Sequence, residues 1–143
     1  GVRLLAIGDT GRLPERTRKL LERSIEQTAG NTKINLVLAL SYGSRAEIAG
    51  AARKIAQKIS AGELRPDAIT EETFGQYLDT AGMPDPDLLI RTSGEMRISN
   101  FLLWQISYAE LYLTDTLWPD FSEQDMEAAV KDYARRTRRF GGI

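Results

Sequence analysis

The sequence predicts an α/β fold in which a mostly parallel central sheet is flanked by helices. Short apolar runs alternate along the chain with segments whose apolar residues recur at helical spacing, as in proteins built from βαβ units. One run, residues 34–40, is apolar at almost every position, which is typical of a parallel strand covered on both faces. The chain has 143 residues, 42% of them hydrophobic, and no linker or internal repeat, so one domain is expected over residues 1–143.

The first expected elements are a strand, a helix and a second strand. Residues 2–7 form a short apolar run that ends at Gly8, which indicates a buried strand followed by a turn. Pro14 suits the first turn of a helix, and the apolar stripe that follows it ends near Gly30. The run at residues 34–40 is then the second strand.

Two helices are expected after the second strand. Ser44 and Glu47 have the spacing of a capping box, so a helix is expected to begin at Ser44. Its apolar residues recur at helical spacing, and Gly62 provides a stop. A shorter helix is expected over residues 70–78.

The second half of the chain is expected to contribute two strands and a last helix. Residues 87–90 are predicted to form the third strand, and residues 110–113, which alternate in direction, are predicted to form the fourth. Between these strands, residues 101–108 are predicted to form one or two helical turns. Ser122 and Asp125 are placed to cap the last helix.

The composition excludes several kinds of chemistry. The chain has no cysteine and no histidine, which removes disulfides, thiolate metal sites, cysteine nucleophiles and the commonest general base. The 19 basic and 20 acidic residues give a net charge of −1, so net charge does not imply a polyanionic partner. No apolar stretch approaches the ~20 residues that a membrane-spanning helix needs. The chain begins at Gly1 within an apolar run, and it is expected to start inside a larger protein.

The polar segment after the third predicted strand is the richest in phosphate-binding chemistry. Arg91 and Arg97 supply two guanidinium groups, whose forked geometry matches a phosphate. Ser99 and neighbouring hydroxyls can complete such a site, because ligands of parallel sheets bind beyond the carboxyl ends of the strands. The alternative is a solvated loop in which Glu95 and Arg97 form a surface ion pair, and the composition alone favours neither reading.

Two further features have both a plain and a functional interpretation. Glu110 stands in an apolar strand, where an acid either faces solvent or helps to hold Mg²⁺ beside phosphate oxygens. The basic end of the chain, from Lys131 to Arg139, is either a frayed helix end or a source of phosphate ligands. The glycine-rich fingerprints of triphosphate and dinucleotide sites are missing from the sequence, so sites of those kinds are not supported.

Several motifs along the whole chain resemble one known family. They include Arg91-Thr-Ser-Gly-Glu95, Arg97-Ile-Ser-Asn-Phe101, Tyr108-Ala-Glu-Leu-Tyr112, Leu117-Trp-Pro-Asp-Phe121 and Arg139-Phe-Gly-Gly142. The block from Arg91 to Phe101 is long and unusual. On these motifs the sequence resembles the C-terminal portion of the cis-prenyltransferase family, and most closely its bacterial undecaprenyl diphosphate synthase type.

The resemblance implies both a fold and a reaction. Enzymes of this family condense isopentenyl diphosphate with an allylic diphosphate, such as farnesyl diphosphate, and need Mg²⁺. The expected product is a polyprenyl diphosphate, here undecaprenyl diphosphate, the lipid carrier of cell-wall synthesis. The resemblance also implies a homodimer that binds no nucleic acid. Its expected location is the cytoplasm, with peripheral contact at the inner face of the membrane through the lipid product.

The resemblance also assigns roles to individual residues. Arg91, Arg97 and Ser99 are expected to bind the diphosphate of isopentenyl diphosphate, and Glu110 to bind Mg²⁺. Arg139 and Gly141 match a C-terminal element that reaches the phosphate site of the partner subunit. The family's catalytic aspartate and the allylic diphosphate site lie in an N-terminal part upstream of this chain, so the chain alone is expected to be inactive.

The chain also departs from the family pattern. The family's Asn-Tyr-Gly-Gly-Arg is Ser41-Tyr-Gly-Ser-Arg45 here, and Met96 stands where some members have histidine. Methionine is a poor ligand for Mg²⁺, so no metal contact is expected at Met96. Two alternatives stay open: a non-catalytic accessory subunit of a prenyltransferase, and a generic phosphate- or RNA-binding domain that uses the basic end of the chain.

Overall fold

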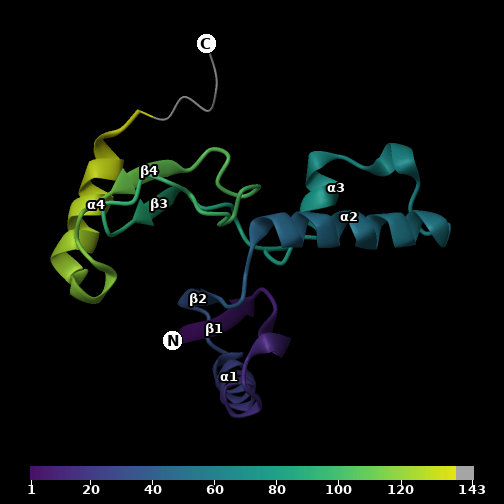
Figure 1. Cartoon of the computed structure of the whole chain (residues 1–143), viewed down its shortest axis with the longest axis horizontal. Coiled ribbons are helices and arrows are strands. Elements are labelled where there is room, and N and C mark those ends of the chain that lie inside the picture. The colour runs from purple at the N-terminus through teal and green to yellow at the C-terminus, as the bar shows by residue number, and fades with distance from the viewer. Residues whose placement is uncertain (138–143) are drawn as a thin grey trace. The chain divides into compact units, whose positions relative to one another are not determined.

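The computed structural model of the chain describes residues 1–137. The chain divides into two compact units, Gly1–Met83 and Pro84–Ile143, and each is described by itself below. Figure 1 labels their helices and strands. The expectation of a single domain stays a prediction.

The first unit begins with two parallel strands and the helix between them. Strands β1 (Val2–Ile7) and β2 (Ile34–Ala39) pair in parallel along their whole length. Helix α1 (Glu15–Thr28) packs on β1, and both lie at the purple end of the colour scale in Figure 1. The Thr28 hydroxyl accepts a hydrogen bond of 3.0 Å from the backbone N–H of Leu4, which fastens the end of the helix to the strand.

Two helices complete the first unit. Helix α2 (Ser44–Ser60) and the short helix α3 (Glu71–Gly75) are confirmed. Helix α3 ends three residues before the end of the predicted range, 70–78. The capping box at the start of α2 is wrong: Gly43 is the N-cap, and no side chain caps the helix. The Glu47 carboxylate is held instead by groups outside the helix.

The second unit has the same parallel arrangement on a smaller scale. Strands β3 (Leu88–Arg91) and β4 (Glu110–Leu113) pair in parallel, with Leu88 opposite Glu110 and Arg91 opposite Leu113. Helix α4 (Glu123–Arg135) packs on β4. The capping box at its start is confirmed, because the backbone N–H of Asp125 donates to Ser122 Oγ at 3.3 Å and that of Ser122 donates to Asp125 Oδ2 at 2.8 Å.

Residues 101–108 form bends and turns and no continuous helix. One backbone bond of helical type is present, from the Ile106 N–H to the Leu102 carbonyl at 3.0 Å, so the prediction of one or two helical turns holds only for a single turn. The backbone φ angles of Ser99, Asn100 and Leu102 are 55°, 63° and 47°, which lie in the left-handed region and cannot start a right-handed helix. Three short 3₁₀ helices are also present among residues 1–137, at Thr10–Arg12, Pro66–Ala68 and Trp118–Asp120.

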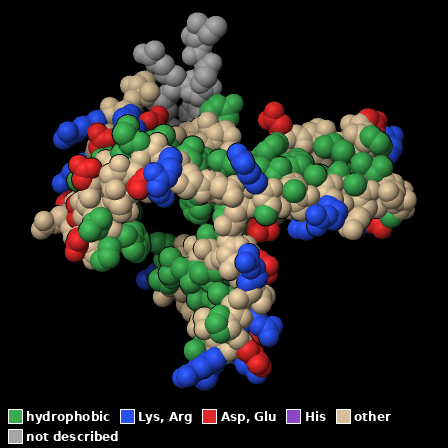
Figure 2. Space-filling model, in the orientation of Figure 1, with side chains coloured by type: hydrophobic (Ala, Val, Ile, Leu, Met, Phe, Trp, Pro, Cys, Tyr) green, Lys and Arg blue, Asp and Glu red, His purple; other side chains and the backbone are tan. Residues whose placement is uncertain are grey.

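Each unit buries a small core and leaves many apolar side chains at the surface (Figure 2). On strand β2, Ile34 and Leu36 are 60% and 50% exposed. On β4 the leucines, Leu111 and Leu113, are exposed, whereas Glu110 on the opposite face is half-buried. Among residues 1–137, no helix combines the length and the hydrophobicity needed to cross a membrane.

Candidate diphosphate-binding site

Arg91 is the last residue of β3, at the carboxyl end of a parallel pair. Its Nε is buried and has no hydrogen-bond partner in the structure. Buried polar atoms are nearly always hydrogen-bonded, and a charged donor without a partner is costly to bury. An anion at this end of the strand would supply the missing acceptor, as a phosphate oxygen does for a guanidinium.

The backbone after Arg91 continues alongside the chain that follows β4. The N–H groups of Ser93 and Gly94 each donate to a carbonyl, those of Thr116 and Thr114, and both bonds are 2.9 Å long. These two N–H groups are therefore occupied and do not form a phosphate cradle. Gly94 has a φ of 64°, and a Cβ there would lie 2.9 Å from the carboxylate of Asp115, which would have to move, so this position favours glycine.

The segment between β3 and β4 is conformationally strained. Four non-glycine residues in it have positive φ: Ser93, Ser99, Asn100 and Leu102. Each such residue costs about 1–3 kcal/mol, and strain of this kind is concentrated at functional sites. Ser99, a predicted diphosphate ligand, is one of these four residues, and it is exposed.

Arg97 lies in the same segment and forms an ion pair with Glu95. The surface ion pair that the composition left open is therefore present. The Arg97 side chain is nevertheless 68% exposed, and exposed ion pairs contribute little free energy. Arg97 can therefore exchange Glu95 for a phosphate at small cost. Met96 is 85% exposed.

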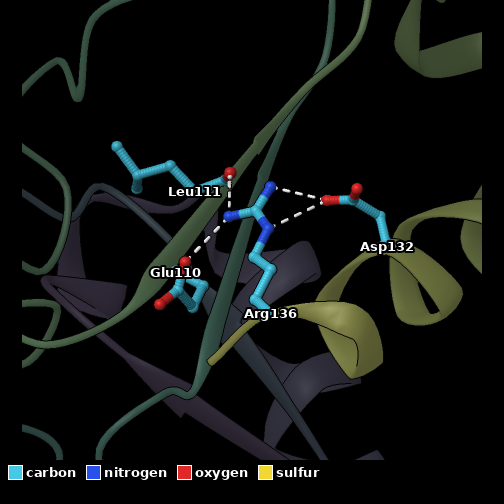
Figure 3. A network of polar contacts seen from close by, with 4 residues as sticks. All are labelled: Glu110, Leu111, Asp132 and Arg136. Atoms are coloured by element: carbon cyan, nitrogen blue, oxygen red, sulfur yellow. Dashed lines mark hydrogen bonds and ion pairs between the residues drawn. The ribbon is translucent and has the colours of Figure 1, made fainter. Parts of the chain in front are cut away.

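Glu110, the predicted Mg²⁺ ligand, is held by an arginine that sequence reasoning did not single out. Arg136 Nη1 donates to Glu110 Oε2 at 2.8 Å and to the backbone carbonyl of Leu111 at 2.9 Å. The other edge of the same guanidinium contacts Asp132, with Nε and Nη2 donating to Oδ2 at 3.0 and 2.6 Å (Figure 3). The hydrogen bonds to Glu110 and then to Asp132 raise the pKa of Arg136.

The described residues do not by themselves fit a Mg²⁺ ion. Residues 1–137 contain no group of three or more acidic side chains arranged to hold a metal. One oxygen of Glu110 faces a guanidinium, whose positive charge opposes a cation at the same place. Arg139 and Gly141, the other predicted ligands near the end of the chain, lie outside the described residues.

The register of β3 and β4 separates the predicted ligands into two groups. Arg91 ends β3, whereas Glu110 starts β4 opposite Leu88. Three steps along a strand span roughly 10 Å. Arg91 is followed in the sequence by the loop that carries Arg97 and Ser99, whereas Glu110 lies at the other end of the strand pair.

The first unit has a polar cavity at the carboxyl ends of β1 and β2. Its volume is about 520 Å³, and it is lined by Gly8, Asp9, Ser41, Tyr42, Gly43, Ala46, Glu47, Gly50, Lys54 and Asp79. The cavity thus brings together the segments that follow β1 and β2. The Gly8 φ of 90° and the 2.4 Å between a Cβ there and the carbonyl of Leu40 require glycine at this turn.

Four of the residues that line this cavity are connected by hydrogen bonds. The Tyr42 hydroxyl donates to Glu47 Oε2 at 2.5 Å, and Glu47 Oε1 accepts from the backbone N–H of Asp79 at 2.8 Å. Asp79 Oδ2 in turn accepts from the N–H of Gly8 at 3.0 Å. Burial, and then the hydrogen bond to Glu47, raises the pKa of Tyr42 well above its usual value, so this hydroxyl keeps its proton.

Parallel strand pairs packed against helices define a protein of the α/β class, in which ligands bind beyond the carboxyl ends of the strands. Residues 1–141 match the family described as "Putative undecaprenyl diphosphate synthase". The chain belongs to this family, the cis-prenyltransferases, as its motifs indicated.

Relatives with assigned activities agree with this membership. The chain is 55% identical over 140 residues to the isoprenyl transferase of Porphyromonas gingivalis, covering 98% of this chain and 55% of that protein. It is 54% identical over 142 residues to the isoprenyl transferase of Geobacillus kaustophilus, covering 99% of this chain and 55% of that protein. The chain therefore spans about half the length of these relatives.

Two solved structures confirm the predicted fold class. Lavandulyl diphosphate synthase from Lavandula x intermedia, solved in complex with dimethylallyl diphosphate, matches with a TM-score of 0.95 and 46% identity, over 98% of this chain and 60% of that one. A probable undecaprenyl diphosphate synthase from Campylobacter jejuni matches with a TM-score of 0.82 and 38% identity, over 98% of this chain and 63% of that one.

Proposed function

We propose that the protein containing this chain is a cis-prenyltransferase that condenses isopentenyl diphosphate with an allylic diphosphate. The product we propose is a polyprenyl diphosphate, namely undecaprenyl diphosphate. The observation that carries the proposal within this chain is the buried Nε of Arg91, which has no partner and lies at the end of a parallel strand. An allylic substrate is supported by the dimethylallyl diphosphate in the related lavandulyl diphosphate synthase.

In this mechanism the residues of the loop after β3 hold the acceptor substrate. Arg91 and Arg97 bind the diphosphate of isopentenyl diphosphate through charged hydrogen bonds, and the Ser99 hydroxyl adds a neutral one. Fixing this diphosphate orients the double bond of the acceptor toward the allylic carbon, which converts a bimolecular encounter into a positioned reaction. A carbon–carbon bond then forms between the double bond of the acceptor and the allylic carbon. The bond from that carbon to oxygen breaks, diphosphate leaves with its electron pair, and the acceptor loses a proton.

The allylic diphosphate and the ion have their sites largely outside the described residues. The proposal keeps Mg²⁺ as the ion of the reaction, where it would neutralise charge on the diphosphates. Glu110 offers one carboxylate that is already paired with Arg136, and residues 1–137 contain no group of three acidic side chains that could hold the ion; waters and diphosphate oxygens would supply further ligands. We assign the catalytic aspartate to the part of the protein upstream of Gly1.

The proposed assembly is a homodimer in the cytoplasm, with peripheral membrane contact through its lipid product. Arg139 and Gly141 would reach the phosphate site of the partner subunit. The exposed side chains of Ile34 and Leu36 offer an apolar surface to a growing prenyl chain, which needs a dry groove.

The test is chain elongation by the intact protein. Supplied with radiolabelled isopentenyl diphosphate, farnesyl diphosphate and Mg²⁺, it should produce labelled prenyl diphosphates longer than the primer, and omission of Mg²⁺ should stop the reaction. Absence of any longer product from folded protein would overturn the proposal and favour an accessory subunit. Arg135→Gln is the matched control for changes at the arginines, because its side chain is exposed and makes no hydrogen bond or ion pair with any other residue of 1–137.

A further inference from the structure

Thr116 belongs to residues 114–116, here called the β4 loop, which follow strand β4 and contact the backbone at and after Arg91. We propose that Thr116 is a positioning residue: its hydroxyl fixes the β4 loop, and the β4 loop fixes the place of Arg91. The inference rests on the proposed function, because it takes Arg91 as a ligand of the diphosphate. Thr116 lies between two of the family motifs, Tyr108–Tyr112 and Leu117–Phe121, so the resemblance assigns it no role.

Three backbone hydrogen bonds join the β4 loop to the chain at and after Arg91. The Arg91 carbonyl accepts from the Thr114 N–H at 3.0 Å. The N–H groups of Ser93 and Gly94 donate to the carbonyls of Thr116 and Thr114, both at 2.9 Å. Strand β4 ends before the β4 loop, so the strand itself does not set the shape of the loop. The shape of the β4 loop therefore determines where the backbone after Arg91 lies.

Side-chain hydrogen bonds set the shape of the β4 loop. The Thr116 N–H donates to Thr114 Oγ1 at 3.2 Å, which is a local turn of the kind that threonine hydroxyls form. Thr114 Oγ1 donates to Thr116 Oγ1 at 3.1 Å, and Thr116 Oγ1 donates to Asp125 Oδ1 at 3.3 Å. Asp125 lies in the first turn of α4. The Thr116 hydroxyl therefore attaches the β4 loop to the helix.

Asp125 is itself held in place by the helix cap. Its other oxygen, Oδ2, accepts from the N–H and the hydroxyl of Ser122 at 2.8 and 2.5 Å. The bond from the Ser122 hydroxyl, and then that from its N–H, lower the pKa of Asp125, so the carboxylate stays ionised and accepts at both oxygens. The path from Asp125 through Thr116 to Arg91 lies entirely within the described residues of the second unit.

The position of the Arg91 backbone matters to a ligand, because little else fixes the Arg91 side chain. Its Nε is buried without a hydrogen-bond partner, and its guanidinium forms no hydrogen bond or ion pair with any other residue of 1–137. A charged hydrogen bond to a phosphate oxygen is about 2.7–2.9 Å long, and a misplacement of about 1 Å can be costly to a positioned reaction. A shift of the backbone at Arg91 would therefore weaken diphosphate binding directly.

The experiment compares Thr116→Val, Thr116→Ser and the control Ser122→Ala in the intact protein. Thr116→Val removes the hydroxyl at nearly constant size, whereas Ser122→Ala weakens the cap of α4 and keeps the bond from Thr116 to Asp125. For each we measure kcat and KM for isopentenyl diphosphate, and hydrogen exchange of the Ser93 and Gly94 amides. Thr116→Val should raise KM about 5-fold with a smaller change in kcat, and should speed exchange of both amides. Thr116→Ser and Ser122→Ala should keep KM within about 2-fold of the wild-type value.

A double-mutant cycle with Arg91→Gln tests whether Thr116 acts through Arg91. In the Arg91→Gln background, Thr116→Val should add less than about 2-fold to KM, because the group it positions is already lost. Multiplication of the two single effects would overturn the inference. So would faster amide exchange in Thr116→Val with unchanged KM, or an equal rise in KM for Ser122→Ala. If Arg91→Gln alone leaves KM unchanged while the wild-type enzyme elongates chains, the diphosphate role of Arg91 fails and the inference fails with it.

Discussion

The two ends of the β3–β4 pair each present an arginine, and the two arginines are in opposite hydrogen-bonding states. Arg91, at the carboxyl end of β3, has a buried Nε without a partner. Arg136, beside the start of β4, uses three of its nitrogens in four hydrogen bonds. An arginine with an unused, buried donor is prepared for an anion that arrives from outside, whereas a saturated arginine stabilises the fold. Both residues are arginines, so it is the number of unused hydrogen-bond donors that distinguishes the arginine expected to bind a ligand from the arginine that stabilises the fold.

The largest expected effect is that of Arg91→Gln. The loss of charged hydrogen bonds to a diphosphate should raise KM for isopentenyl diphosphate roughly 100-fold. The melting temperature should change little, because Nε has no protein partner to lose. Steady-state kinetics and thermal melts of the intact protein check both. Arg91→Lys keeps the charge and lacks Nε, so its KM should lie between that of the wild type and that of Arg91→Gln. A large loss of stability with unchanged KM would contradict the contrast with Arg136.

A smaller effect is expected at Arg97. Its side chain is exposed and already shares its charge with Glu95, so Arg97→Ala should weaken isopentenyl diphosphate about 10-fold. Glu95→Gln removes the competing partner and should leave KM equal or lower. Binding measured by calorimetry would decide, and an unchanged affinity in Arg97→Ala would remove Arg97 from the site.

Ser122→Ala tests stability without touching either arginine. It removes the side chain that caps α4, which should lower the free energy of unfolding by about 1 kcal/mol. Because Ser122 contacts neither arginine, KM for both diphosphates should stay within about 2-fold of the wild-type value. Denaturant unfolding and kinetics measure the two quantities. A large rise in KM would mean that any destabilisation of α4 disturbs the substrate site, and would contradict the separation between residues that stabilise the fold and residues that bind substrate.

An effect of the same size as that of Ser122→Ala is expected in the first unit, and it shrinks at high pH. The raised pKa of Tyr42 means that the folded protein keeps this proton above pH ~10, where the unfolded chain loses it. The stabilisation is complete below that pH and declines as pH rises further. Tyr42→Phe should be less stable by about 1 kcal/mol at neutral pH, and the difference from wild type should narrow above pH ~10. Unfolding curves from pH 8 to 11 measure it; a constant difference would contradict it.

Local sequence signals predicted the elements well where the structure uses local contacts. The four strands appear at the predicted apolar runs within one residue at each end, since these runs are bounded by glycine or polar residues. The cap at Ser122 is correct because its partner, Asp125, is three residues away; Asp125 also accepts a hydrogen bond from nearby Thr116, and this bond uses its other carboxylate oxygen.

The failures occur where distant residues compete for the same group. Glu47 does not cap its own helix because Tyr42 and the backbone of Asp79, 32 positions away, take both of its carboxylate oxygens. Residues 101–108 have the hydrophobicity of a helix, but left-handed residues at 99, 100 and 102 prevent one. Glu110 was recognised as important from its motif, yet its partner Arg136 could not be found from spacing, because only the fold brings the two together.

The strained loop between β3 and β4 has a consequence for how this protein can be changed. Four non-glycine residues of this loop have positive φ angles, which glycine adopts at a lower steric cost: Ser93, Ser99, Asn100 and Leu102. Glycine at any of them would relieve strain in the folded state, but it would also give the unfolded and ligand-free loop more conformations to lose on capturing a diphosphate. Substitutions at these four positions that raise the thermal stability should therefore weaken the affinity for the diphosphate. An engineered variant that gains stability at this loop is expected to lose substrate affinity.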